Sequence, residues 1–307
     1  MKPKVIFMGT PEFAVPVLKT LIEMTDVVLV VTQPDKLVGR KQELTFSPIK
    51  KVAIENNIEV FQPVKLRDEV SCILNVDADL IVTCAYGQIL PEEVLNHPTI
   101  ASINVHASLL PKLRGGAPIH HAIIDGYDKT GITIMFMAKG MDDGDIISQE
   151  ETKIYSTDNV GTLHDRLMIM GAELLKKTLP DIVNKTNKRI KQDESKVTYA
   201  YNIKREEEHI DFNNEGIKII NLIHGLDPWP TANTILNDVE YKVLEAEFEK
   251  KDVVEPCKIV VSKGTLGVTC KDGIIYFKYI KPFGKKAMSV KDFLNGNHEN
   301  IERWSVK

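Results

Sequence analysis

Cysteine is scarce in this chain, and its usual motifs are absent. The 307 residues include four cysteines, and no two of them form a C-x-x-C pair. This spacing argues against a zinc cluster and against a thiol–disulfide centre. Cys84 and Cys270 lie in apolar runs, where a cysteine behaves as a small hydrophobic residue. We therefore expect free thiols in a reducing compartment.

Long apolar runs and a strong excess of charge are also missing. No stretch stays apolar for the ~20 residues that a transmembrane helix needs. The N-terminus, MKPKVIFMGT, has no apolar segment of signal-peptide length. A formal net charge of −4 excludes nonspecific binding of nucleic acid by the chain as a whole. We expect a cytoplasmic protein in which any contact with nucleic acid comes from a local basic patch.

The common nucleotide and zinc motifs do not occur either. The first apolar run leads into GTPEFA, which lacks the glycines of a dinucleotide-binding turn, and no P-loop lysine motif is present. There is also no H-E-x-x-H pair. We therefore expect neither NAD nor ATP bound by these routes, and no metal.

What the sequence contains is a series of short apolar runs separated by helical patterns. Thr10 is expected to cap the helix after the first run. Nearly continuous apolar strands are typical of a mostly parallel sheet with helices on both faces, a doubly wound α/β fold. A strand pair over 131–137 and 145–154 and a helix over about 157–183 are also predicted. The four apolar runs cover residues 4–9, 26–32, 78–85 and 102–106.

The composition changes in the second half of the chain. A polar, highly charged stretch predicts an exposed linker. Short strand-like runs with the turn signals KGTLG and KDG follow it, and these predict a small all-β domain, an OB-like barrel. We expect a catalytic domain over residues 1–189, a linker over 190–207 and a β-barrel domain over 208–307.

Two polar residues interrupt the last apolar run of the first domain. In SINVHASLLPKLRGGAPI, residues 102–119, Asn104 and His106 lie two positions apart and therefore face the same side of a strand. An amide that cannot ionise and an imidazole that carries a proton suit the stabilisation of an oxyanion during proton transfer. The alternative is a hydrogen-bonded core histidine beside an asparagine that caps the loop.

The acidic turn KGMDDGDI offers carboxylate partners for this histidine. Asp142, Asp143 and Asp145 are the candidates. A histidine that must stay oriented usually has a carboxylate partner. Spacing alone leaves three uses open, namely a partner for His106, a divalent cation site and an ordinary polar turn.

Two further segments suggest ligand contacts. TQPDKLVGRKQELTFSPIKK, residues 32–51, is basic and long for a strand–helix connection, so phosphate contact and an ordinary solvated surface are both open. AYGQILPEEVL, residues 85–95, places a glycine turn after a strand. Its backbone groups would suit a flat heterocycle, and an ordinary connection is the alternative.

Together these segments resemble the methionyl-tRNA formyltransferase family, a branch of the enzymes that use 10-formyltetrahydrofolate. The resemblance runs along nearly the whole chain, through MGTPEFAVPVL, VVTQPDKLVGRK, ADLIVTCAYGQILP, SINVHASLLPKLRGGAPI, TGITIMFMAKGMDDGDI, TYAYNIKREEEHIDF and GLDPWPTA. It implies a Rossmann-like transferase, expected to be a monomer, that acts in translation initiation. The implied reaction moves a formyl group from 10-formyltetrahydrofolate to the α-amine of methionine on initiator tRNA.

The resemblance also implies roles for individual residues. Asn104, His106 and Asp142 match the catalytic trio of the family. Contacts to the folate cosubstrate fall on Ser108, Leu109, Leu110 and Pro111, and the pterin pocket falls on Tyr86, Gly87, Gln88, Ile89 and Leu90. Contacts to tRNA fall on Lys36, Arg40 and Lys41, and the C-terminal barrel matches a tRNA-binding domain.

The sequence departs from the family in two places. Its acidic turn reads M-D-D-G-D where L-D-T-G-D is common, and GRKQEL is less basic than the same loop in many members. Two other functions stay open, a formyltransferase that acts on an aminosugar nucleotide and a noncatalytic protein that binds tRNA or folate.

Overall fold

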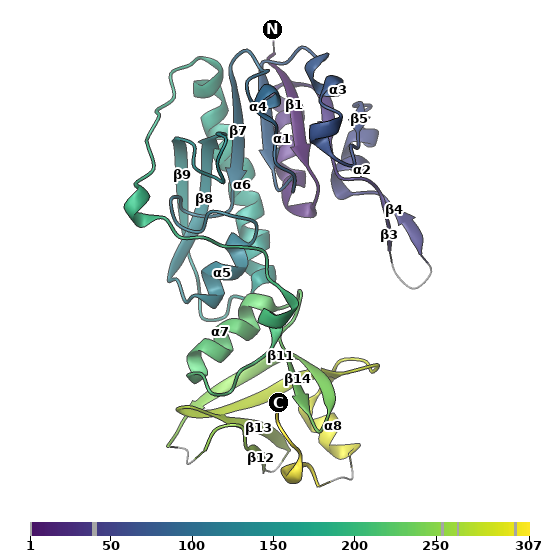
Figure 1. Ribbon diagram of the computed structural model, residues 1–307, viewed down its shortest axis with the longest axis vertical. Helices are drawn as coiled ribbons and strands as arrows, with labels where there is room; N and C mark the ends of the chain where they lie inside the picture. Colours follow the sequence, from purple (N-terminus) through teal and green to yellow (C-terminus); the bar gives the residue numbers. More distant parts are fainter. Residues whose placement is uncertain (1, 39–41, 253–254, 263, 298–299) are drawn as a thin grey trace. The chain divides into compact units, whose positions relative to one another are not determined.

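The chain forms two compact units in the computed structural model (Figure 1). The structure describes residues 2–38, 42–252, 255–262, 264–297 and 300–307. Unit 1 comprises residues 1–118, 129–153 and 164–201, and unit 2 comprises 119–128, 154–163 and 202–307. The predicted catalytic domain, linker and barrel were defined by function as well as by position. Their boundaries therefore stay predictions.

Unit 1 is built on a seven-stranded sheet with the order β5-β2-β1-β6-β7-β8-β9 (Figure 1). The pairs from β5 to β7 are parallel, and β8 and β9 are added antiparallel. The mostly parallel α/β sheet is therefore confirmed, as is the predicted pairing of the last two strands. The strands are β1 (Lys4–Gly9), β2 (Asp26–Val31), β5 (Val60–Phe61), β6 (Leu80–Cys84), β7 (Ala101–His106), β8 (Lys129–Phe136) and β9 (Ile146–Lys153).

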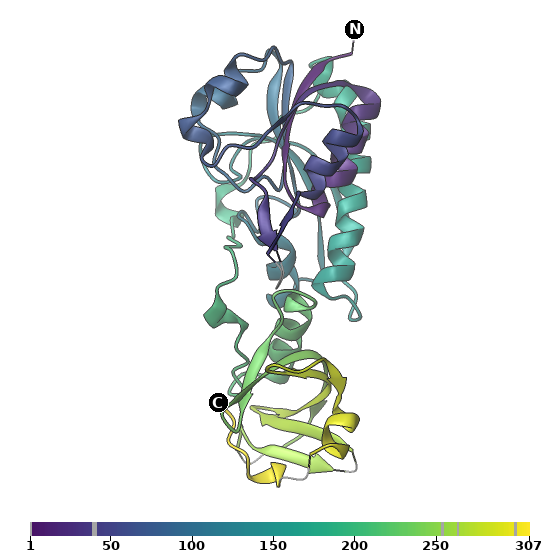
Figure 2. The ribbon, with the colours of Figure 1, turned by 90° about the vertical axis from the view of Figure 1, so that its right-hand side faces the viewer.

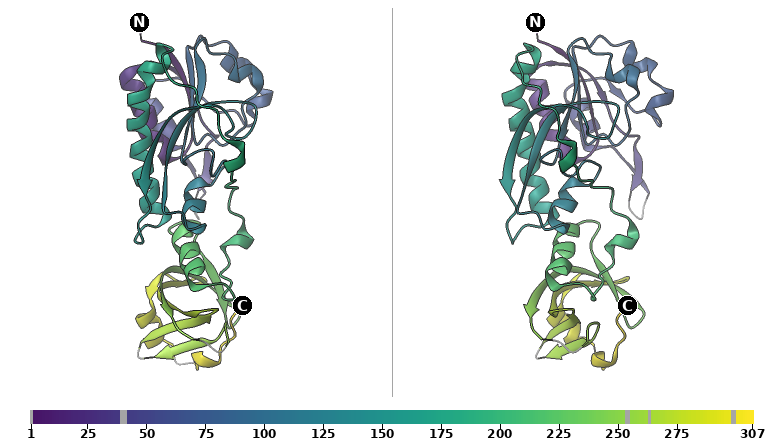
Figure 3. Two further views of the ribbon diagram at one scale, coloured as in Figure 1. Left: turned by 90° about the vertical axis from the view of Figure 1, so that its left-hand side faces the viewer. Right: turned by 60° about the vertical axis from the view of Figure 1, so that its left-hand side comes forward.

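Helices cover both faces of this sheet, and α1 and α6 lie on the opposite face from α3 (Figures 2 and 3). Gly171 allows α6 to approach the sheet closely, because a Cβ at this position would lie 3.2 Å from Val105 Cγ1. The helices of this unit are α1 (Val15–Met24), α2 (Pro48–Glu55), α3 (Ser71–Leu74), α4 (Glu92–Leu95) and most of α6 (Val160–Val183), whereas α5 (Pro118–Ile124) belongs to unit 2 except for its first residue. No helix in the described part of the chain is long and apolar enough to span a bilayer.

The expected helix cap at Thr10 is wrong. A 3-10 turn, Glu12–Ala14, precedes α1, and its N-cap is Pro11, so the hydroxyl of Thr10 is not needed at the helix end. Thr10 Oγ1 instead donates to the carbonyl of Tyr86 and accepts from the backbone N–H of Gln33, both at 3.3 Å. Thr10 therefore joins the segments that follow β1, β2 and β6.

Unit 2 contains an antiparallel sheet with the order β10-β11-β14-β13-β12, and β15 pairs with β14. The predicted β domain is confirmed as an antiparallel sheet, and the region also contains two helices. In the described residues the strand pairs form an open path, and no pair joins β10 to β12. The elements are α7 (Gly216–Leu226), β10 (Asn233–Leu236), β11 (Val239–Lys250), β12 (Ile259–Ser262), β13 (Thr265–Cys270), β14 (Gly273–Pro282), β15 (Met288–Ser289) and α8 (Val290–Asn295).

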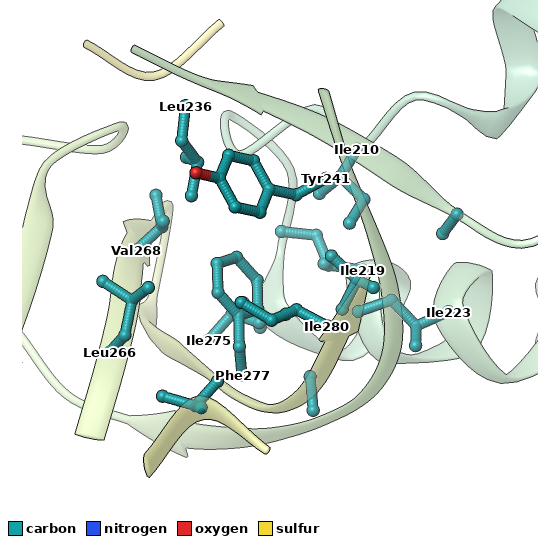
Figure 4. Packing of buried hydrophobic residues seen from close by; sticks show 14 of the residues in the cluster. Ile210, Ile219, Ile223, Leu236, Tyr241, Leu266, Val268, Ile275, Phe277 and Ile280 are labelled. Carbon is teal, nitrogen blue, oxygen red and sulfur yellow. The ribbon is translucent and has the colours of Figure 1, made fainter. Parts of the chain in front are cut away.

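The core of unit 2 lies between this sheet and α7 (Figure 4). Side chains alternate along β14, so Ile275 and Phe277 are buried while Tyr276 between them is less so. Phe277 packs edge-on against Phe212 with 6.3 Å between the ring centroids. Ile219 and Ile223 complete the contact from the helix side.

We predict that Phe277→Ala lowers the free energy of unfolding of unit 2 by about 3–5 kcal/mol, because it leaves a cavity in this core. Phe283→Ala is the matched control, since this ring is 79% exposed and its loss should cost less than about 0.5 kcal/mol. Both tryptophans, Trp229 and Trp304, belong to unit 2, so urea titration followed by tryptophan fluorescence reports this unit. Equal losses for the two variants would contradict the described core.

Candidate functional site

The candidate site lies where the central strands of unit 1 end. Ligands of open α/β sheets bind outside the carboxyl ends of the parallel strands. Here the carbonyl of Tyr86, just after β6, accepts hydrogen bonds from Thr10 and from Gln33 Nε2, the latter at 3.1 Å. The segments that follow β1, β2 and β6 are thus tied to one another beside the end of β7.

Asn104 and His106 lie on the face of β7 that is turned away from α6. Val105, between them, packs against α6 at Gly171. The His106 side chain is 6% exposed and Asn104 is half-buried. The alternation expected from the sequence therefore holds at this strand.

Acceptor oxygens lie beside both ring nitrogens of His106. Nε2 is 3.0 Å from the carbonyl oxygen of Leu113, and it must carry a hydrogen in order to donate to that carbonyl. Nδ1 is 3.7 Å from Asp142 Oδ2, which is longer than a direct hydrogen bond. The ring is therefore placed between a loop carbonyl and a carboxylate.

Of the three candidate acids, Asp142 is the one beside His106. Its Oδ2 also accepts a hydrogen bond from the backbone N–H of Gly115 at 2.9 Å. Asp145 pairs instead with Arg189 Nε at 3.1 Å, and Asp143 is exposed. The geometry thus separates the carboxylates that spacing alone left equivalent.

The amide of Asn104 is oriented by Thr83, a residue that sequence reasoning missed. Thr83 is the strand neighbour of Asn104 on β6, and its hydroxyl donates to Asn104 Oδ1 at 2.8 Å. Because this bond occupies the oxygen side, the amide NH2 is the side available to a ligand. The signal in the sequence was a single threonine inside the apolar run LIVTCA.

The loop over residues 108–111 is fixed by polar side chains from β8 and β9. The Ser108 hydroxyl donates to the carbonyl of Lys112 at 2.7 Å. Thr133 Oγ1 donates to the Ser108 carbonyl at 2.6 Å and accepts from the Leu110 N–H at 3.1 Å. Gln149 Nε2 donates to the Leu110 carbonyl at 2.9 Å. Ser108 and Leu110 are buried, whereas Leu109 and Pro111 are half-buried.

The segment over residues 86–90 turns at Gly87, whose φ of 86° favours glycine. Tyr86 and Leu90 point into the core of unit 1, while Ile89 is 88% exposed. The Leu66 N–H donates to Gln88 Oε1 at 2.8 Å. Burial raises the pKa of Tyr86 to about 12, and within the described residues its hydroxyl has no hydrogen-bond partner.

The basic segment forms a hairpin of β3 (Lys36–Val38) and β4 (Glu43–Thr45). The Lys36 side chain is exposed, and the candidates Arg40 and Lys41 lie outside the described residues. Lys50, also in this segment, is used within the fold, because its Nζ lies 2.5 Å from Asp35 Oδ2. Hydrogen bonds from Lys50 and Gln62 lower the pKa of Asp35 below its usual value.

The described ranges contain no cluster of three or more histidine, cysteine, aspartate or glutamate side chains able to hold a metal ion. The four cysteines are free thiols. Burial raises the pKa of Cys84 to about 12, so this thiol stays protonated at neutral pH.

Comparison with known proteins agrees with this architecture. The formyl transferase family matches residues 1–179, and the C-terminal domain of formyl transferases matches residues 202–298. The fold and the two matches define the class of protein as a formyl transferase.

Proteins related in sequence show to which family within this class the chain belongs. The chain is 51% identical over 302 residues to a methionyl-tRNA formyltransferase of Staphylococcus epidermidis, with 97% of each chain covered. It is 49% identical over 303 residues to the enzyme of the same name from Staphylococcus aureus, again with 97% of each covered. The chain belongs to the methionyl-tRNA formyltransferase family, as the resemblance in its sequence predicted.

Solved structures share the fold at lower identity. A sugar 3N-formyl transferase, determined in the presence of dTDP and 5-N-formyl-THF, matches with a TM-score of 0.69 and 20% identity, covering 93% of this chain and 100% of its own. An N-formyltransferase from Helicobacter canadensis, in complex with folinic acid and dTDP-3-aminofucose, has a TM-score of 0.67 and 20% identity, covering 90% and 98%.

We predict that Asp142→Gly accelerates hydrogen exchange of the Gly115 amide by about 10- to 100-fold, because a hydrogen bond to a charged acceptor contributes about 1.5–3 kcal/mol. Glycine is chosen because Asp142 has a φ of 50°, which glycine adopts without strain. Asp143→Gly is the matched control and should leave this amide unchanged. Faster exchange in the Asp143 variant alone would show that the acids are misassigned. NMR exchange measurements provide the test.

Proposed function

We propose that this chain transfers the formyl group of 10-formyltetrahydrofolate to the α-amine of methionine on initiator tRNA, giving N-formylmethionyl-tRNA and tetrahydrofolate. The main support for the proposal is the arrangement of Asn104, His106 and Asp142 beside the carboxyl end of β7. Identity of about half over nearly the full length of methionyl-tRNA formyltransferases supports the choice of substrates.

The residues present fit a folate cosubstrate. The NH2 of Asn104, left available by the Thr83 bond to the amide oxygen, suits the oxygen of a bound formyl group. The site would hold the cosubstrate between residues 86–90 and 108–111. When bound, the cosubstrate supplies the activated formyl group, and no metal is required.

Asn104 and His106 would stabilise the charge that develops during direct attack by the amine. The NH2 of Asn104, oriented by Thr83, is a donor for the formyl oxygen as that oxygen becomes negative. A His106 ring with a proton on each nitrogen fits its two acceptor neighbours and adds positive charge at the same place.

Asp142 would orient His106 and accept a proton. Its Oδ2 lies 3.7 Å from Nδ1, beside the ring and without a direct hydrogen bond, so the carboxylate is able to accept a proton from an amine bound next to the pair. A proton that leaves the attacking amine would pass to this pair and from there to the departing folate nitrogen.

The rest of the chain would hold the tRNA. We assign phosphate contacts to the hairpin segment with Lys36, Arg40 and Lys41, and a second tRNA surface to the antiparallel domain from about residue 208. Residues 1–189 would form the catalytic domain and 190–207 the connection. The enzyme would act as a cytoplasmic monomer.

We predict that His106→Ala and Asn104→Ala each lower turnover at least ~100-fold, because removal of one donor to a developing oxyanion costs ~100- to 1000-fold. The control is His97→Ala. His97 Nε2 also bonds a backbone carbonyl, that of Val76, but at the opposite, amino edge of the sheet. Turnover is measured by formylation of charged initiator tRNA, and folding by circular dichroism. Near-normal turnover in pure His106→Ala protein would refute the assignment.

We also predict that charged initiator tRNA is formylated much faster than any aminosugar nucleotide supplied at equal concentration. The exposed Lys36 in the basic segment over residues 32–51 favours a polyanionic substrate, and the C-terminal domain is the part of the chain to which the family resemblance assigns tRNA binding. The assay compares both amines with 10-formyltetrahydrofolate. A faster reaction with the sugar would favour the aminosugar reading, and binding of tRNA and folate without transfer would favour a noncatalytic role.

A further inference from the structure

We propose that residues 190–200, here called the strap, position the His106–Asp142 pair, and that Gln192 is the central positioning residue. The inference rests on the proposed function, since it assigns the strap a part in the same reaction. The strap lies wholly within unit 1. Its hydrogen bonds reach both loops that surround the pair.

The strap first holds the acidic turn. Ile190 and Ile146 exchange backbone hydrogen bonds of 2.8 and 2.9 Å at the start of β9. Gln192 Nε2 then donates to the carbonyl of Asp142 at 2.7 Å and to the carbonyl of Gly144 at 2.8 Å. One amide group therefore fixes the backbone directly after Asp142 and again two residues later.

Arg114 fixes the orientation of this amide. Arg114 Nε donates to Gln192 Oε1 at 3.0 Å. A guanidinium can only donate and carbonyls can only accept, so the amide oxygen must face Arg114 and its nitrogen the turn. Arg114 is 3% exposed, and it is also paired with Glu194 through a 2.8 Å contact.

The far end of the strap holds the second loop, residues 113–117. The Leu113 N–H donates to Thr198 Oγ1 and the Arg114 N–H to the Thr198 carbonyl, both at 2.9 Å. The Ala200 N–H donates to the Arg114 carbonyl at 2.7 Å, and the Ala117 N–H donates to the Ala200 carbonyl at 3.0 Å. The strap therefore binds this loop through its backbone and through the side chain of Thr198.

This second loop carries the remaining partners of the pair. The Leu113 carbonyl accepts from His106 Nε2, and the Gly115 N–H donates to Asp142. Gly115 lies so close to the strap that a Cβ would be 2.5 Å from the carbonyl oxygen of Ala200. Each loop is therefore held by the strap on one side and by the His106–Asp142 pair on the other.

The positioning role follows from the backbone at Asp142. Its φ of 50° lies in the left-handed region, which is unfavourable for a residue with a side chain. The two hydrogen bonds from Gln192 keep the turn in the conformation that points Oδ2 at Gly115 and His106. Without these two hydrogen bonds, the turn would more readily leave this conformation, and the Asp142 carboxylate would move away from His106.

The test uses the full-length chain with Gln192→Ala and Gln192→Glu. Glutamate keeps the size of the side chain and removes both donors. We expect turnover to fall by about 10- to 100-fold in each variant, since misplacement of a catalytic group by about 1 Å costs about 100-fold. KM for charged tRNA and for the folate should change less than kcat, and the pH profile of kcat should shift. Ser195→Ala is the control, because its hydroxyl bonds Asp193 within the strap.

The outcomes distinguish this inference from the proposed function. Wild-type kcat and an unchanged pH profile in both Gln192 variants would overturn the positioning role while leaving the function intact. Absence of formylation by the wild-type chain would refute the function instead. In that case exchange of the Gly115 amide decides the role of the strap, since Gln192→Ala should accelerate it and Ser195→Ala should not. An equal Gly115 rate in wild type and Gln192→Ala would refute the positioning role.

Discussion

The hydrogen bond from the Gly115 amide to the Asp142 carboxylate joins two loops that belong to distant parts of the sequence. One loop follows β7 and the other connects β8 to β9. His106 lies between them, with Leu113 on one side and Asp142 on the other. The geometry of the pair therefore depends on whether these loops keep their relative position, more than on the strand that carries the histidine.

Sequence periodicity predicted the parts of this site that lie on regular structure. The alternation in SINVH placed Asn104 and His106 on one face of a strand, and apolar runs located the strand itself. The choice of Asp142 over Asp143 and Asp145 needed the family resemblance, because adjacent acids in a turn have no periodic signal. Thr83 and Gln192 were not found, since a hydroxyl in an apolar run and an amide in a charged stretch acquire meaning only from their neighbours in space.

The errors and omissions have the same physical origin. Thr10 was expected to cap a helix because the local pattern matches a cap, but the chain forms a 3-10 turn first and the hydroxyl bonds Tyr86 and Gln33 instead. The segment after residue 190 was predicted to be exposed from its charges, and most of its residues are exposed, but its contacts were not foreseen. Only the tertiary structure shows that Arg114 draws Gln192 and Glu194 onto the first unit. Local sequence patterns predict helices and strands well. The conformations and contacts of the loops depend on polar contacts between residues far apart in the sequence.

The two partners of Arg114 differ in their response to ionic strength. Glu194 is 73% exposed, so dissolved salt screens its attraction to the guanidinium. Gln192 is neutral, and its hydrogen bonds to the backbone of the acidic turn carry no net charge to be screened. The bonds from Gln192 to the turn are thus insensitive to the salt concentration, unlike the exposed Arg189–Asp145 pair in the same turn, and this would help an enzyme that acts on the polyanionic substrate proposed above.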